Sequence, residues 1–70
     1  VEVSFCQGTL NVRSDEHIQR VFVFDSFGRL VFAIENINDK TFSKRIATSG
    51  VFTIRIQTES EIVSKKALNF

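Results

Sequence analysis

The sequence predicts a small all-β fold, an antiparallel sandwich or barrel that occupies residues 1–70 as a single domain. Short apolar or alternating stretches recur about every ten residues, with turn residues between them, which indicates about seven short strands. No helical pattern extends beyond about two turns. Seventy residues are enough for one domain only.

Two amphipathic strands open the chain, at residues 1–6 and 9–13, and Gln7-Gly8 supplies a two-residue turn between them. The side chains expected to face inward are Val1, Val3, Phe5, Leu10 and Val12. The polar segment from Ser14 to Gln19 is expected to be an irregular connection, with Ile18 closing the end of the core. Since Val1–Phe5 already alternates like a strand, we expect the chain to be a piece of a longer protein.

A continuous apolar run, Val21–Phe24, resumes at Leu30–Phe32 after a short interruption. Such runs are typical of strands buried on both faces, so we expect a central hairpin whose phenylalanine rings dominate the core. The interruption has the chemistry of a turn. Asp25 and Ser26 favour a type I turn, and Gly28 can adopt the positive φ that closes the loop with a bulge.

The second half of the chain continues the β pattern. Glu35–Lys40 is the expected loop, and Thr41–Ala47 is an edge strand in which Lys44 shares the inward face of Phe42 and Ile46. After a turn at Thr48–Gly50, the strand Val51–Thr58 has the clearest alternation of the chain, and a last strand follows at Glu61–Asn69. In the strand Val51–Thr58, the residues expected to face inward are Phe52, Ile54 and Ile56.

Composition argues against several classes of function. Nine Lys and Arg are interleaved with eight Asp and Glu, for a net charge of +1, so no nucleic acid is expected as a partner. No apolar run approaches the roughly 18 residues of a membrane span. A single cysteine cannot form an internal disulfide.

We expect no catalytic site, no metal and no cofactor. Cys6 with His17 as its base would be a dyad without an orienting third group, and His17 has no second histidine or nearby cysteine to complete a metal site. The acidic residues fall at turns, where carboxylates are usually solvated or cap the backbone. The segment Arg20–Phe24 is faintly similar to the aromatic strands of single-stranded nucleic-acid binders, but its neighbours favour a core strand.

Three motifs in order resemble the C-terminal sorting domain of cargo proteins of the type IX secretion system of Bacteroidota. The first is an aspartate two residues before Gly-Arg, matched by Asp25, Gly28 and Arg29. The second is a Gly-x-aromatic that opens an amphipathic strand, matched by Gly50 and Phe52. The third is a lysine-containing apolar tail, and its residues are Lys65, Lys66, Ala67, Leu68, Asn69 and Phe70.

The resemblance implies an immunoglobulin-like β-sandwich without catalytic activity of its own. It implies that the domain takes an attached cargo from the periplasm through an outer-membrane translocon. A sortase then removes the domain and joins the cargo to lipopolysaccharide at the cell surface. The expected partners are therefore the translocon and the sortase, and the terminal segment Ser64–Phe70 is the expected recognition element, read by strand addition or by a groove.

Two other functions stay open on the residues alone, an adhesion or spacer module of a surface protein and a small-barrel nucleic-acid binder. Whichever function holds, the sorting domain included, the absence of proline and the short connections allow a homodimer, formed by strand exchange or by pairing of sheet edges.

Overall fold

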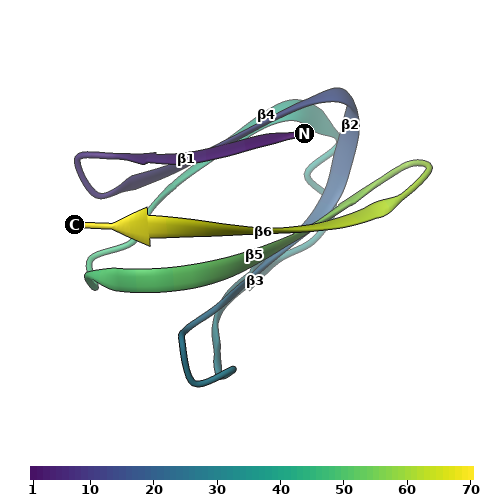
Figure 1. Ribbon diagram of the computed structural model, residues 1–70. Coiled ribbons are helices and arrows are strands. Elements are labelled where there is room, and N and C mark those ends of the chain that lie inside the picture. The colour runs from purple at the N-terminus through teal and green to yellow at the C-terminus, as the bar shows by residue number, and fades with distance from the viewer.

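The computed structural model describes all 70 residues, which form six strands and no helix (Figure 1). The strands are β1 (Glu2–Cys6), β2 (Thr9–Phe24), β3 (Leu30–Ile34), β4 (Asp39–Arg45), β5 (Gly50–Thr58) and β6 (Ile62–Asn69). All pairings are antiparallel, and the single sheet curls over itself into two layers. The predicted all-β antiparallel class is confirmed, with six strands in place of about seven.

The 16-residue strand β2 is the element around which the sheet is built. Its first half pairs with β1 and with β4 over the same residues, 9–13, so these two strands lie on opposite edges of β2. Its second half pairs with β3 and with β5 over residues 21–24 in the same manner. Strand β6 then pairs with β5. Each layer therefore contains half of β2.

The segment Ser14–Gln19 is part of β2, so the predicted irregular connection is wrong. Ser14 and Ile18 are buried, which continues the inward alternation of the preceding residues. The register then shifts, because Ile18 and Arg20 face consecutive residues of β5 and leave Gln19 as the extra residue of a bulge. A bulge bends a strand and increases its twist, which is how β2 passes from one layer to the other.

Polar residues are tolerated at this bend because they bond to one another and to the β5–β6 turn. The Glu16 amide donates to Ser14 Oγ at 3.1 Å. The Glu16 carboxylate accepts from Ser60 Oγ at 2.7 Å and from Thr58 Oγ1 at 2.9 Å. The hydrogen bond from Ser60, followed by that from Thr58, lowers the pKa of Glu16 below its ordinary value.

The core is aliphatic rather than aromatic. Its nine buried residues are Leu10, Val12, Ile18, Val21, Val23, Ile46, Phe52, Ile54 and Ile56. The expected hairpin buried on both faces is wrong: Val21 and Val23 are buried, whereas Phe22 and Phe24 point outward and are half-exposed. Strand β3 pairs with β2 alone and is an edge strand, with Leu30 exposed. A continuous apolar run hides which face is inward, since both phases of the alternation are apolar.

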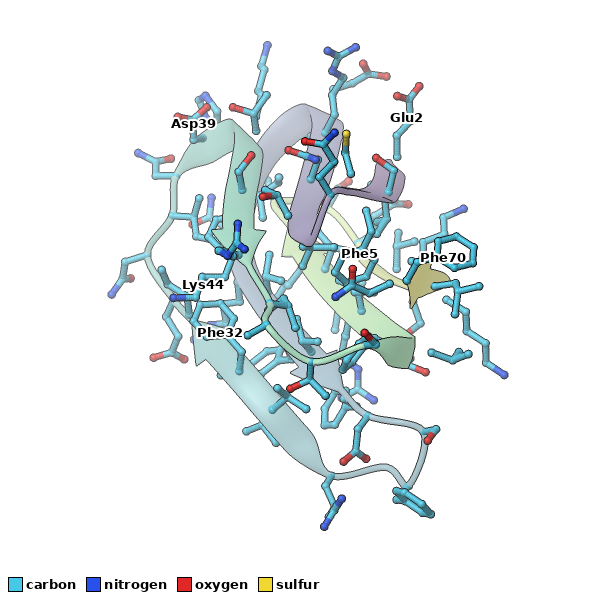
Figure 2. All side chains as sticks on the ribbon, turned by 90° about the vertical axis from the view of Figure 1, so that its left-hand side faces the viewer. Glu2, Phe5, Phe32, Asp39, Lys44 and Phe70 are labelled. Carbon is cyan, nitrogen blue, oxygen red and sulfur yellow. The ribbon has the colours of Figure 1, made fainter.

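Aromatic contacts join the inner faces of the two layers. Phe5 of β1 packs on Phe52 of β5, with ring centroids 5.8 Å apart. Phe32 of β3 stacks on Phe42 of β4 at 6.1 Å. The Lys44 ammonium lies 5.0 Å from the Phe32 ring centroid, and Figure 2 shows this side chain beside the ring. Phe42 is half-buried, and Ile46, directly after β4, is buried, so these two predicted inward positions and the lysine that shares their face are confirmed.

Left-handed backbone conformations occur in the β1–β2 and β3–β4 connections. Gln7 and Gly8 have φ of 51° and 83°, as a two-residue hairpin turn requires, so this predicted turn is confirmed. Asn36 and Asn38 have positive φ in the β3–β4 connection. That loop is shorter than expected, because its last two residues begin β4.

Candidate functional site

The three motifs of the predicted signature meet at one end of the molecule. The β2–β3 turn lies against the first residues of β5, since Phe24 pairs with Thr53. The end of β6 lies on the other side of β5, with Lys66 opposite Thr53 and Asn69 opposite Gly50. Two adjoining depressions, of about 450 and 320 Å³, are lined by these segments. The predicted site residues that line one or both of them are Asp25, Gly28, Arg29, Gly50, Phe52 and Lys66.

Asp25 organises the β2–β3 turn. Its Oδ1 accepts from the backbone N–H groups of Phe27 and Arg29, both at 2.9 Å, and its Oδ2 accepts from Arg29 Nε at 3.0 Å. The Gly28 amide donates to the Asp25 carbonyl at 3.0 Å, and Gly28 has φ of 80°, which confirms the predicted turn chemistry. The hydrogen bond from the Arg29 amide is the largest cause that holds the pKa of Asp25 below its usual value. The motif's aspartate, glycine and arginine thus have a structural role.

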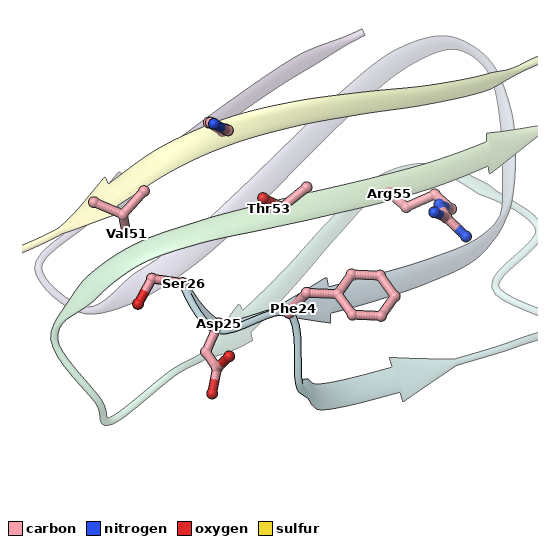
Figure 3. A pocket seen from close by; sticks show the side chains of 8 residues that line it. Phe24, Asp25, Ser26, Val51, Thr53 and Arg55 are labelled. Atoms are coloured by element: carbon pink, nitrogen blue, oxygen red, sulfur yellow. The ribbon is translucent and has the colours of Figure 1, made fainter.

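The larger depression lies on the outer face of the sheet, between this turn and the β5–β6 hairpin (Figure 3). Phe24, Ser26, Thr53, Arg55 and Lys66 are among its lining residues. The Arg55 guanidinium lies 5.5 Å from the centroid of the Phe24 ring. In Figure 3 the Asp25 carboxylate points away from β5. The polar groups that face this depression, apart from Asp25, are therefore hydroxyls and cations.

The smaller depression has more hydrophobic lining residues, four against two in the larger one. Phe27, Val31 and Val51 line it together with the residues that precede β5. Phe27 is 82% exposed at the tip of the turn. Val51 pairs with Leu68 of β6, and both side chains are about half-exposed, at 46% and 47%. Exposed apolar side chains therefore extend from the turn to the end of β6.

The terminal segment, the predicted recognition element, is divided by the alternation of β6. Lys66, Leu68 and Phe70 are exposed on the outer side, and Phe70 is 96% exposed. Figure 2 shows the Phe70 side chain beyond the end of the ribbon. Ala67 is half-buried and Asn69 is buried. Lys65 is exposed on the opposite face from Lys66.

Asn69 fixes the end of β6 to the connection between β4 and β5. Its Nδ2 donates to the Ile46 carbonyl at 3.0 Å and to the Thr48 carbonyl at 2.9 Å. Within the predicted tail this side chain is a structural anchor, and it is not accessible to a partner.

Strand β6 is paired along one edge only. β5 forms its ladder, and β1 lies beside its other edge without a β-ladder between them. The two neighbouring strands run in the same direction, towards the left of Figure 1.

The structure does not bring Cys6 and His17 together. Cys6 is exposed at the end of β1, opposite Thr9, whereas His17 lies far along β2 and its Nδ1 is 3.2 Å from Glu59 Oε1. No three His, Cys, Asp or Glu side chains gather where they could hold a metal ion. No helix is long and apolar enough to cross a membrane.

The residues that sequence reasoning missed are Phe24, Thr53 and Arg55. Thr53 and Arg55 were expected on the outward face of their strand, but nothing in the sequence placed the β2–β3 turn beside them. Phe24 was expected in the core. The signal that could have corrected this is the alternation of valine and phenylalanine, because the smaller β-branched residue takes the inner position here.

Comparison with known proteins gives the chain a family but no relative of assigned function. Residues 1–69 match the family described as a domain of unknown function, DUF8694, and the chain therefore belongs to that family. No curated protein matches the sequence.

Proposed function

We propose that this member of the DUF8694 family is a non-catalytic sorting domain, which directs an attached cargo across the bacterial outer membrane through the type IX secretion system and is then removed by a sortase. The observation that carries the proposal is the convergence of the three motifs. They are far apart in the chain, yet residues of the first two motifs line adjoining depressions at one end of the molecule, and the terminal motif contributes Lys66 to the larger one. A partner that docks at this end could read all three at once.

The chemistry of this end suits recognition by another protein. Leu68 and Phe70 expose apolar surface at the end of β6, and Lys66 adds a charge on the same side of the strand. Because β1 lies beside the unpaired edge of β6, we expect a partner to read the exposed side chains of this strand rather than to add a strand to it. Because Asn69 holds this strand in place, the recognition surface is presented in a fixed conformation.

The test is to fuse a fluorescent reporter, itself preceded by a signal peptide for export across the inner membrane, to the N-terminus of residues 1–70. The fusion is expressed in a type IX-competent member of the Bacteroidota and in an isogenic strain that lacks the translocon. We expect the reporter on the cell surface of the competent strain, released from the domain, and in the periplasm of the deficient strain. Retention in the periplasm of both strains would overturn the proposal. Surface delivery that does not depend on the translocon would instead favour an adhesion or spacer module.

A pair of variants locates the recognition surface. Replacing Leu68 and Phe70 together by serine removes exposed apolar groups without touching the core, and surface delivery should fall. Ile62→Ser is the matched control, because Ile62 is also on β6 and is 64% exposed, but at the other end of the strand. Equal loss of delivery in both variants would refute the assignment. Deletion of Ser64–Phe70 would be less informative, since it also removes Asn69.

A further inference from the structure

The larger depression carries a second inference, which can be tested separately from secretion. We propose that it binds the phosphate group of a small phosphorylated ligand, such as a sugar phosphate, between Arg55 and Lys66. Both residues line this depression of about 450 Å³. They are diagonal neighbours on the β5–β6 ladder, because Arg55 faces Ser64 and Lys66 faces Thr53. Diagonal neighbours lie about 7–8 Å apart, within reach of a shared ligand for two long side chains.

The two cations have no acidic partner within the chain. The other arginines near this face are paired, Arg20 with Glu35 at 3.4 Å and Arg29 with Asp25 at 3.0 Å, whereas Arg55 and Lys66 form no ion pair. Asp25 is the one acidic residue that lines the depression. Its oxygens already accept hydrogen bonds from the Arg29 side chain and from the turn amides, so the Asp25 carboxylate competes little with a bound anion for Arg55 and Lys66.

The uncharged groups at the site are also suited to an anion. The Ser26 and Thr53 hydroxyls line the depression and donate to no other group of the chain. The Arg55 guanidinium lies over the Phe24 ring, 5.5 Å from its centroid, and this cation–π contact restrains it before a ligand arrives. A restrained guanidinium loses less conformational entropy when it forms paired hydrogen bonds with phosphate oxygens.

Size and charge favour a small phosphate ester over a nucleic acid. The depression is within the range of small-ligand sites, about 300–1,000 Å³, and is larger than phosphate alone, so Phe24 and Val51 can contact the rest of the ligand. Stacking of bases needs free aromatic faces, whereas Arg55 lies against the Phe24 ring. A net charge of +1 also gives the chain little electrostatic attraction for a polyanion such as a nucleic acid.

The test is an NMR titration of the ¹⁵N-labelled chain at pH 7.5 with glucose 6-phosphate, inorganic phosphate, glucose and a single-stranded oligonucleotide. We expect saturable shifts at the amides of Ser26, Thr53, Arg55 and Lys66 with glucose 6-phosphate, weaker binding of phosphate and none of glucose. Absence of saturation with both phosphate compounds would overturn the proposal. Tighter binding of the oligonucleotide than of glucose 6-phosphate would overturn it in favour of a nucleic-acid site.

Charge-matched variants separate a site from general attraction. Arg55→Gln and Lys66→Gln should each weaken glucose 6-phosphate roughly tenfold, the loss of one charge-assisted contact. Lys65→Gln and Arg45→Gln remove the same charge from exposed positions that do not line the depression, and should change the affinity less than about twofold. Equal weakening in all four would refute the site. Since binding is measured on the isolated chain, its failure leaves the sorting proposal untouched, and failure of sorting leaves this one untouched.

Discussion

Replacing Asn69 tests whether the end of β6 is an anchor rather than a free tail. The Asn69 side chain is 3% exposed and donates two hydrogen bonds, to the Ile46 and Thr48 carbonyls. Each neutral hydrogen bond contributes about 1 kcal/mol to stability, so Asn69→Ala should lower the free energy of unfolding by about 2 kcal/mol. In a domain of this size that corresponds to a fall in Tm of about 8–16 °C.

Asn69→Asp should be more damaging, although it changes only one atom of the side chain. A carboxylate cannot donate to the two carbonyl oxygens that the amide now serves, and burying an unpaired charge costs about 3 kcal/mol or more. The introduced carboxyl would have a folded-state pKa above its unfolded value of about 3.9. The stability gap between this variant and the wild type should therefore be smallest below that pH and should widen as the pH rises.

Thermal unfolding followed by circular dichroism, at several pH values, measures both effects. Asn36→Asp is the control, because Asn36 is exposed in a loop with a left-handed backbone that aspartate also tolerates. If Asn69→Asp and Asn36→Asp unfold at the same temperature at neutral pH, the anchoring role of Asn69 is wrong.

Three further predictions concern the bend, the core and the thiol. Hydrogen bonds from Ser60 and Thr58 lower the pKa of Glu16 from 4.5, so their contribution to stability is present above that pH and is lost as the pH falls through the lowered pKa. Glu16→Gln should therefore lose less stability in acid than the wild type. An equal loss of unfolding free energy in acid for both proteins would contradict this. Ile54 is fully buried, and Ile54→Ala should cost about 2–5 kcal/mol in urea unfolding, whereas a cost below about 1 kcal/mol would contradict its place in the core. Cys6 is exposed, so an oxidising buffer should produce a disulfide-linked dimer on non-reducing gels, and Cys6→Ser should abolish it.

The sequence predicted the parts of the fold in which one face is apolar and the other polar. The inward faces of the strand Val51–Thr58 and of the first hairpin were predicted correctly. The position of the turn at Asp25 was also predicted correctly. The β class and the antiparallel pairing follow from these elements alone. They are specified locally, by alternation and by turn residues, and local signals are what a single sequence carries.

The bend of β2 could not be predicted, because its polar residues are stabilised by contacts distant in sequence. Ser14 and Glu16 face the inner side, where apolar residues would be expected, and Glu16 bonds to residues more than forty positions away. Without those partners the segment has the composition of a loop. The candidate phosphate site could not be predicted for the same reason, since Arg55 lines a depression only when the β2–β3 turn is folded beside it.

The last strand shows why a motif contiguous in sequence is not a single surface. Its inward residues, Ala67 and Asn69, hold β6 against the rest of the sheet, whereas Lys66, Leu68 and Phe70 are presented outward. A substitution at an inward position therefore acts through stability, and a substitution at an outward position acts through binding. Under the proposed sorting function, cargo delivery should fail in both cases, but only the first should also lower Tm. Measuring Tm and delivery for Asn69→Ala and for the Leu68 and Phe70 double variant separates folding from recognition within a single strand.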